Sequence, residues 1–422
     1  MTTMMSDLYS VMSNQFSAYR WRQTGYWLLI MGYCLLITAC ANPGIECEDD
    51  LGCVEVGPDD SIQLGYLLAL SGEAAYLGED AWQAVELALS QRGTLLGHPL
   101  ELIGFDTGCD VEMGRSVAIE AADFSTILGI IGTTCSAVAE TALPIISRAG
   151  MVMVSPTNTM ANVPQLDDEL GQLSYFRTAP NELWQAEVAA SFAREELGVQ
   201  TAAILYDTTP YSNNLRQTFA DAFTALGGSV ILQPRLVPGG TDINDVLALL
   251  VGNQPDLLYL PLFEPEANYL LNNLLENSSW LLLGTDSLLL PSFAESTGTV
   301  ARGLYLTGTA VNGPAYDDFL AQWLALYDIT PSSDFAPHAY DAANILLDAI
   351  ESAAQVGNDN SLLIGRLALR QAIADTTRLN GVTGQLTCQA SECGSRSALG
   401  IYQITDAQVT SQIWPPPLIW QP

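Results

Sequence analysis

The feature that most constrains the fold is a regular alternation between short apolar runs and longer segments with helical spacing of apolar residues. Four such runs and three such segments follow one another after Ser61, in the order 62–70, 79–92, 100–106, 111–124, 127–132, 136–150 and 151–155. Buried strands joined by helices of this kind form parallel sheets covered on both faces. The pattern therefore predicts a βαβ series that begins near residue 61.

A second series of the same kind follows. Its expected helices are 181–198, 212–228, 241–253 and 265–277, and its expected strands are 201–207, 229–237, 257–262 and 280–284. Further strand-like stretches occur near 303–310 and 381–388, with helices expected at 317–327 and 338–354 between them. The sequence thus predicts an α/β fold of two lobes with parallel sheets, joined by three crossings of the chain.

The expected boundaries follow from this order. One lobe comprises 61–178 and 309–383, and the other comprises 179–308 and 384–416. A length of 422 residues accommodates two domains of this size.

Composition excludes one class of partner. The formal net charge is -33, from 47 acidic residues against 14 basic ones, all of which are Arg. Such a surface repels the phosphate backbone of nucleic acids and the anionic head groups of lipids. We therefore expect no nucleic-acid partner.

The first residues have the features of an export signal. Arg20 and Arg22 precede an apolar stretch, 25–39, that is shorter than the about 20 residues of a membrane span. The stretch ends in Ile-Thr-Ala followed by Cys40, which resembles a bacterial lipobox. That resemblance implies a lipoprotein signal peptide, 1–39, with the lipid on Cys40. An ordinary signal peptide or an uncleaved anchor are the alternatives.

The residues after Cys40 are expected to form an acidic tether, 40–60, with the rest of the mature chain outside the membrane. An exported chain keeps disulfides. Six cysteines remain after Cys34 and Cys40 are set aside: Cys47, Cys53, Cys109, Cys135, Cys388 and Cys393. Two pairs are close in sequence, 47 with 53 and 388 with 393, but the sequence alone does not fix the pairing.

Several local patterns carry a resemblance to a known family. They are the Ser-Gly turn and later Gly of LALSGEAAYLG, FDTGCD, GTTCSAVAETALPI, VSPTNTMANV, FRTAP and AYDAANILLDAI. In this order and spacing, from about Ile62 to Gln412, the chain resembles the extracytoplasmic solute-binding proteins of the branched-chain amino acid (Leu/Ile/Val) type. The resemblance implies the periplasmic binding protein type I fold, with two Rossmann-like lobes, a ligand between them and an ABC permease as partner.

The first lobe is expected to bind the ligand's carboxylate. Ser136 lies where a helix begins after a strand and a short turn, a position whose free N–H groups suit an anion. The bland alternative is a helix-capping serine, worth about 1 kcal/mol. The resemblance adds Thr157 and Thr159, from SPTNT, to the carboxylate and ammonium contacts. Their alternative is a turn whose hydroxyls face solvent.

The second lobe is expected to complete the site. The resemblance places Asp286, where the family has Glu, beside the ligand's ammonium, with a capping role as the alternative. Asp is one methylene shorter, so its contact could pass through a water molecule. Tyr211, Phe263 and Leu77 are expected to line an apolar wall, and Glu182 is a second candidate acid.

A catalytic cysteine at Cys135 is the competing hypothesis. A reactive cysteine needs an electropositive, reduced setting, and neither His98 nor His338 has a visible Cys or Ser partner in the sequence. The chain also lacks phosphate-binding glycine motifs and Cys/His metal spacing. The resemblance pairs Cys135 with Cys109 in a disulfide, which would fix the turn before Ser136.

The expected function is capture of a small amino acid, aliphatic or branched, by a monomeric protein without cofactor or metal, lipid-anchored outside the cytoplasmic membrane. Two alternatives stay open. One is a binder of urea, short amides or other small polar ligands on the same fold. The other is a lipoprotein that senses a ligand and has no transport role.

Overall fold

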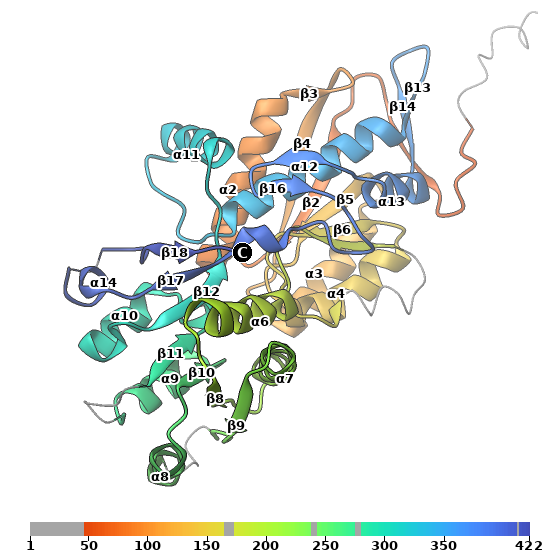
Figure 1. The fold of residues 1–422 in the computed structure, drawn as a ribbon. Helices are drawn as coiled ribbons and strands as arrows, with labels where there is room; N and C mark the ends of the chain where they lie inside the picture. The colour runs from red at the N-terminus through yellow and green to blue at the C-terminus, as the bar shows by residue number, and fades with distance from the viewer. Residues whose placement is uncertain (1–45, 164–172, 238–242, 275–279, 412) are drawn as a thin grey trace, which may run out of the picture. The chain divides into compact units, whose positions relative to one another are not determined.

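Two β-sheets, each made mainly of parallel strands, organise the chain after Asp49 (Figure 1). The computed structural model describes residues 46–163, 173–237, 243–274, 280–411 and 413–422. The predicted signal peptide and Cys40 lie outside the described residues. Asp49–Pro422 forms one compact unit.

The first sheet has six strands. In spatial order they are β3 (Thr94–Leu95), β4 (His98–Asp106), β2 (Ile62–Leu68), β5 (Ile127–Gly132), β6 (Val152–Ser155) and β7 (Tyr175–Arg177). All neighbouring pairs are parallel except the short β3–β4 pair. The predicted series of strands in a mostly parallel sheet is confirmed, and β7 is a strand that the sequence pattern did not identify.

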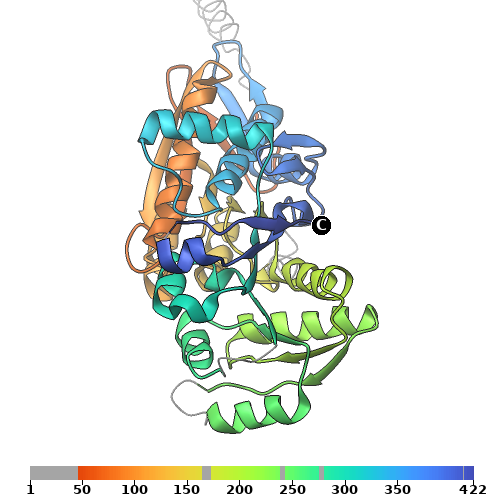
Figure 2. The same cartoon turned by 60° about the vertical axis from the view of Figure 1, so that its left-hand side comes forward.

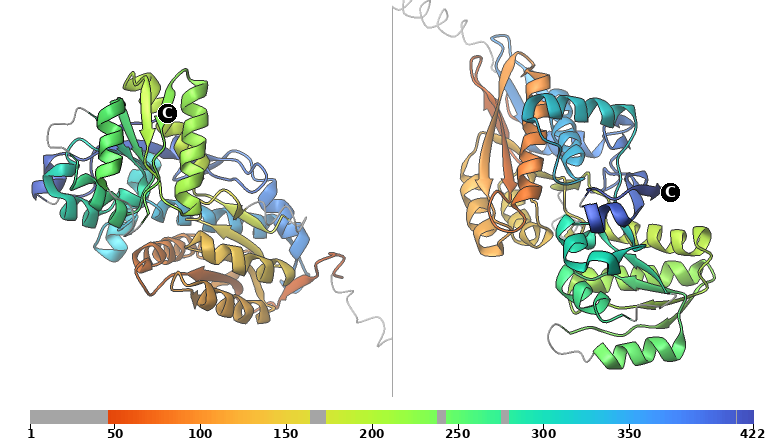
Figure 3. Two further views of the ribbon diagram at one scale, coloured as in Figure 1. Left: turned by 90° about the horizontal axis from the view of Figure 1, so that it is seen from below. Right: turned by 90° about the vertical axis from the view of Figure 1, so that its left-hand side faces the viewer.

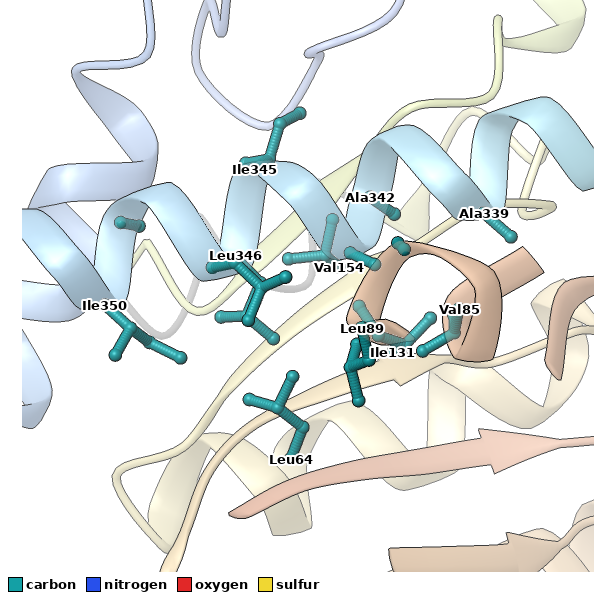
Figure 4. Close-up of a cluster of buried hydrophobic side chains, with 14 of the residues drawn as sticks. Leu64, Val85, Leu89, Ile131, Val154, Ala339, Ala342, Ile345, Leu346 and Ile350 are labelled. Carbon is teal, nitrogen blue, oxygen red and sulfur yellow. The ribbon is translucent and has the colours of Figure 1, made fainter. Parts of the chain in front are cut away.

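Helices cover both faces of this sheet, as the alternation of its side chains requires. Leu64 and Leu68 of β2 pack under α2 (Ala75–Arg92) and α12 (Ala336–Ala353), whereas Leu67 faces the opposite side. Figure 4 shows α12 lying across α2 and the sheet, and Figure 2 shows the same two helices together although they are far apart in sequence.

The opposite face is covered by α3 (Val111–Asp123) and α4 (Ser136–Arg148), which pack side by side (Figure 3). Ala118 and Ala121 of α3 pack in one buried cluster with Ala139 and Ala142 of α4. These small residues let the two helices come close together. Their packing fixes the start of α4 relative to the end of β5.

The second sheet has seven strands. In spatial order they are β18 (Leu418–Trp420), β17 (Leu399–Gln403), β12 (Tyr305–Thr309), β11 (Leu281–Gly284), β10 (Leu257–Leu260), β8 (Thr201–Ile204) and β9 (Ser229–Leu232). The pairs from β12 to β9 are parallel, and β17 and β18 are antiparallel additions. One face packs on α6 (Glu182–Ser191) and α7 (Pro210–Ala225). The other packs on α8 (Ile243–Asn253), α9 (Glu264–Leu271) and α10 (Pro291–Thr297).

Three crossings join the two sheets. The chain leaves the first sheet after β7, because α6 already packs on the second. It returns after β12, since α11 (Pro314–Tyr327) and α12 belong to the first core. It crosses again between Cys393, buried in the first core, and β17. The predicted α/β architecture with three crossings is therefore confirmed.

The remaining elements are small. They are β1 (Cys53–Val56), β13 (Ala354–Val356), β14 (Leu362–Gly365), α13 (Arg366–Ala374), the β15 (Leu379–Gly381) and β16 (Gly384–Leu386) hairpin, and α14 (Asp406–Ser411). Within the segment expected to act as a tether, β1 pairs antiparallel with β14, and Asp49 accepts hydrogen bonds from the amides of Leu367 and Ala368 at 3.0 and 2.9 Å. Asp49 thereby binds the start of α13. The strand-like stretch near 381–388 forms the β15–β16 hairpin.

Candidate functional site

The loops that follow β5 and β6 are joined by buried hydrogen bonds. The Thr157 hydroxyl donates to the carbonyl oxygens of Thr133 and Thr134, at 3.2 and 2.7 Å. The Asn158 amide donates to the same Thr133 carbonyl at 2.8 Å. Neither Thr157 nor Asn158 is exposed by more than 7%. The two strand-end loops thus form one rigid shelf, defined here as residues 133–136 and 155–161.

Ser136 is the first residue of α4 and lies at the edge of this shelf. Cys135 is the N-cap, and no side chain caps the helix, so the capping role considered for Ser136 is not observed. The Ser136 hydroxyl instead accepts a hydrogen bond from the Met160 amide at 3.4 Å. The α4 N-terminus therefore keeps backbone amides of its first turn, and its positive dipole end, for another partner.

Glu182 is buried at the centre of the site. It is the first residue of α6, and its side chain is fully buried. Its Oε1 accepts from the Ala161 amide at 3.0 Å and from the Asn214 side chain at 2.8 Å, which links the shelf to α7. Its Oε2 is also buried and has no hydrogen-bond partner among the described residues. An ionised carboxylate oxygen in this state is costly unless a ligand donates to it.

Asp286 follows β11 in a short 3-10 turn. Its Oδ1 accepts from the Tyr211 hydroxyl at 2.5 Å and from the Gln185 side chain at 2.8 Å. No hydrogen bond within the described residues goes to Oδ2. Thr285 is the N-cap of the turn and no side chain caps it, so the capping alternative for Asp286 is not observed.

The charges of this region are coupled. Burial, followed by weaker effects that include the negative charge of Asp286, raises the pKa of Glu182 despite hydrogen bonds that act the other way. Burial and the Asp286 carboxylate also raise the pKa of Tyr211 well above its ordinary value. The negative charge of Asp286 near the buried Glu182 carboxyl group favours a cationic partner between them.

Tyr211 and Phe263, two of the residues predicted to line an apolar wall, lie against each other. Their ring centroids are 5.2 Å apart, and Phe263 is 40% exposed. Leu77 is half-buried in the first turn of α2. Its neighbour Tyr76 lies close enough to Asp286 that, after burial, the Asp286 charge raises the pKa of Tyr76. Gly78 allows α2 to approach β2, because a Cβ there would collide with the Ala69 carbonyl oxygen.

Thr159 is half-buried within the shelf, and its carbonyl accepts from the Glu182 amide at 2.9 Å. The contacts therefore connect Ser136, Thr157, Thr159 and Glu182 in one network, and Asp286, Tyr211 and Phe263 in a second. Glu182 joins the two through Asn214 and through its interaction with Asp286.

Sequence reasoning missed Asn158, Gln185 and Asn214. Gln185 lies three residues after Glu182 on α6, so helical spacing could have placed both on one face. Asn158 stands inside the SPTNT segment, but its partners are set by the loop geometry and leave no local signal.

The structure contains the disulfides Cys109–Cys135 and Cys388–Cys393. Cys47 and Cys53 are also disulfide-bonded. The Cα atoms of Cys109 and Cys135 are 5.5 Å apart, so the bond ties the turn after β4 to the N-cap of α4. Cys135 is thus a structural residue within the shelf, disulfide-bonded to Cys109 as the resemblance implied.

Both histidines are buried. The ring nitrogens of His98 contact the carbonyl oxygens of Asp60 and Asn360, at 2.9 and 2.8 Å. His338 Nδ1 lies 3.0 Å from the Thr178 carbonyl oxygen. Within the described ranges, no group of His, Cys, Asp or Glu is placed to hold a metal ion, and no helix has the length and apolar character needed to cross a bilayer.

Comparison with known proteins identifies the family. The family model for the periplasmic binding proteins matches residues 61–406, which is most of the chain and includes every predicted ligand contact. The chain belongs to that family.

The relatives of this periplasmic binding protein agree with its fold. The Leu/Ile/Val-binding protein BraC3 of Rhizobium johnstonii is 25% identical over 338 residues, which cover 78% of this chain and 90% of the relative. The branched-chain amino acid transporter substrate-binding protein LivJ of Streptococcus pneumoniae, solved with isoleucine, has a TM-score of 0.68 and 19% identity, covering 83% of this chain and 98% of that one. The resemblance to the branched-chain amino acid type is confirmed.

The same fold also holds other ligands. A solute-binding protein of an ABC transporter from Rhodopseudomonas palustris, solved with benzoate, has a TM-score of 0.64 and 19% identity, covering 82% of this chain and 93% of that one. The fold alone therefore does not select a ligand. The selection rests on the side chains of the site.

Proposed function

We propose that this periplasmic binding protein is lipid-anchored through Cys40, captures a small amino acid with an aliphatic or branched side chain, and presents it to an ABC importer. The observation that carries the proposal is the buried, unpartnered Oε2 of Glu182 next to Asp286. These acids are linked to a shelf that ends at the uncapped N-terminus of α4. The arrangement complements a molecule with one ammonium and one carboxylate group.

The carboxylate group of the ligand binds at the shelf in this proposal. The first amides of α4 and the Ser136 hydroxyl donate to it, and Thr159 adds its hydroxyl. The Thr157 hydroxyl is already used within the shelf, so Thr157 acts by holding the turn and by offering its backbone carbonyl to the ammonium group.

The ammonium group binds between Glu182 and Asp286. An ammonium has three N–H donors, which suits Glu182 Oε2, Asp286 Oδ2 and one backbone carbonyl. Tyr211 and Gln185 hold Asp286 Oδ1, which leaves Oδ2 for the ligand or for a bridging water molecule.

The side chain of the ligand lies against Tyr211, Phe263 and Leu77. Closure of the lobe comprising 61–178 and 309–383 onto the lobe comprising 179–308 and 384–416 buries it. The site offers hydrogen-bond donors, acceptors and an apolar wall, and in this proposal the ligand is bound and released without a chemical change. The protein acts as a monomer on the outer side of the cytoplasmic membrane.

A ligand panel read by calorimetry tests the ligand class. The chain from Ala41 onward is titrated with aliphatic amino acids, benzoate, urea and short amides. Binding of leucine, isoleucine or valine, without binding of the matching carboxylic acids, is the expected result. Binding of benzoate or urea instead would replace the proposed ligand class.

Substitution of Asp286 tests the ammonium contact. Asp286→Asn removes the negative charge that would bind the ligand's ammonium group. A hydrogen bond to a charged group contributes about 1.5–3 kcal/mol, so amino acid affinity should fall roughly 10- to 100-fold. Asp406→Asn is the control, because Asp406 is 68% exposed and pairs with Arg302 away from the site. An amino acid affinity that is unchanged in Asp286→Asn would remove the ammonium role.

The pH dependence of affinity tests Glu182 in the same way. Its pKa is raised, so acidification protonates it and removes the acceptor charge. Amino acid affinity should therefore fall as the pH drops through that raised value, and Glu182→Gln should abolish this part of the dependence.

For the anchor, Cys40→Ser should release the protein from membranes, and continued membrane retention would reject lipid attachment.

A further inference from the structure

Arg177 is a deeply buried, positively charged side chain next to the shelf. It ends β7 and is 1% exposed. Its Nη1 donates to the carbonyl oxygens of Asn158 and Met160, at 3.1 and 2.7 Å. Thr159 stands between these two residues, so Arg177 holds the shelf on both sides of a predicted ligand contact.

The charge of Arg177 is balanced from a distant part of the chain. Glu392 accepts from Arg177 Nε at 3.0 and 3.1 Å and from Nη2 at 2.5 Å. This is a bidentate carboxylate–guanidinium pair, which fixes the orientation of the guanidinium group as well as its distance from the carboxylate. The Arg177 fork therefore points at the shelf because Glu392 occupies its other edge.

Glu392 is itself held in place by a closed loop. The Cys388–Cys393 disulfide closes the loop, and Gln389 and Glu392 exchange backbone hydrogen bonds across its turn. The loop pairs with the free edge of β7, since the Arg177 amide donates to the Ser391 carbonyl and the Cys393 amide donates to the Arg177 carbonyl, both at 2.9 Å. The disulfide loop thus acts as a short extra strand beside β7.

This loop lies just before the third crossing between the sheets. Cys388 and Cys393 belong to the first core, and the chain enters the second sheet at β17. Arg177 lies just before the first crossing. Two of the three crossings are therefore joined at the Arg177–Glu392 pair.

We propose that Arg177 and Glu392 are positioning residues for the ligand shelf, and that the Cys388–Cys393 loop holds them in register. They orient Thr159 and the Met160 amide that binds Ser136, and they touch no ligand. The inference rests on the proposed function, because it assigns the pair to amino acid binding at the shelf.

Hydrogen exchange in the ligand-free protein tests the physical link. Glu392→Gln leaves Arg177 buried without its counter-charge and loosens the fork. Exchange of the amides in 157–163 should then rise at least tenfold. Arg396→Gln is the matched control, because Arg396 lies close in sequence and forms an exposed ion pair with Glu187. Wild-type protection in Glu392→Gln would overturn the inference.

A binding cycle distinguishes positioning from simple stabilisation. Glu392→Gln and Thr159→Ala should each weaken leucine binding about tenfold, and the double variant should also lose about tenfold rather than about a hundredfold. Independent, multiplied losses would show that Glu392 acts on stability alone and would refute positioning.

Removal of the disulfide gives a second route if Glu392→Gln folds poorly. Cys388→Ser/Cys393→Ser keeps Glu392 but opens its loop, and it should raise exchange in 157–163 and weaken leucine binding in the same non-additive way with Thr159→Ala. Unchanged exchange and affinity would overturn the role of the loop. If the wild type binds no amino acid at all, the proposed function fails, while the exchange result still decides whether the pair holds the shelf.

Discussion

The two sides of the candidate site are built differently. On the first-sheet side, Thr157 and Asn158 are buried, hydrogen-bonded across two loops, and backed by the Cys109–Cys135 disulfide. On the second-sheet side, Asp286 and Tyr211 are half-buried, and Phe263 is 40% exposed. A preformed shelf lowers the entropy lost on binding, whereas an open wall can adapt to the ligand's side chain. We therefore expect the shelf to fix the position of the ligand, and the open wall of Tyr211 and Phe263 to set the preference for its side chain.

Removing the Cys109–Cys135 disulfide, which backs the shelf, should have the largest effect on the free energy of unfolding. The Cys109–Cys135 bond closes a loop with a sequence separation of 26, and the chain-entropy model gives it about 3–4 kcal/mol of unfolding free energy. Cys388–Cys393 closes a separation of 5, for which the same model gives about 2 kcal/mol. Denaturant unfolding of the two double Cys→Ser variants measures both losses. A larger loss for the shorter loop would reverse the expected order.

The stability of the protein should be sensitive to acid through His338 of α12, which contacts the Thr178 carbonyl oxygen just after β7. Burial lowers the pKa of His338 to about 4, from an ordinary value of 6.5. The neutral ring therefore contributes stability that is complete above pH 6.5 and is lost as the pH falls towards 4, in total about 3 kcal/mol. The free energy of unfolding of His338→Gln, followed against pH, should fall less steeply than that of the wild type in this window.

Asp341 affects the free energy of unfolding in the same pH range, with the opposite sign. Burial raises the pKa of Asp341 to about 6, and protonation of such a group favours the folded state as the pH falls below that value. The wild-type curve is therefore a sum of opposing effects, and only the difference between the two proteins isolates His338. Parallel curves would show that His338 carries no part of the acid sensitivity.

Thr157→Val should weaken the shelf although valine has nearly the same size and shape as threonine. The variant leaves two buried carbonyl oxygens, those of Thr133 and Thr134, without this donor, which costs about 1–3 kcal/mol of stability. Amino acid affinity should fall as well, because Ser136 and Thr159 lose their fixed spacing. Thr157→Ser keeps the hydroxyl and is the control. Calorimetry and thermal unfolding of both variants decide the point, and equal behaviour would dismiss the hydroxyl.

Phe263→Ala should have the smallest effect and should sharpen the comparison. Since Phe263 is partly exposed and packs on Tyr211, its truncation should cost less than about 1 kcal/mol of stability. The ranking among leucine, isoleucine and valine should change more than the average affinity does. A uniform loss across the three amino acids would place specificity elsewhere.

The sequence predicted what local periodicity encodes. The strand at 127–132 and the helix start at Ser136 are found where the pattern placed them, because both periods are clear over those residues. β7 was missed because three residues cannot show a period. β17 was missed because it lies beyond the alternating series and pairs antiparallel with β12.

The site was predictable only as far as single residues in motifs. Ser136 and Asp286 stand at strand ends, where ligands bind in α/β folds. The links between them are not local. Arg177 and Glu392 are 215 positions apart, and Thr133, whose carbonyl accepts from the Asn158 side chain, is 25 positions from Asn158. Such contacts depend on how the loops fold, and no spacing rule reports them.

The folded start of the body has a mechanical consequence. A pull on the chain ahead of β1 would load the four-residue ladder between β1 and β14, with the hydrogen bonds of Asp49 to the start of α13 beside it. The force would pass into α13 and β14, which belong late in the sequence, before reaching β2. We therefore expect tension on the chain ahead of β1 to reach the ligand shelf only after these contacts break.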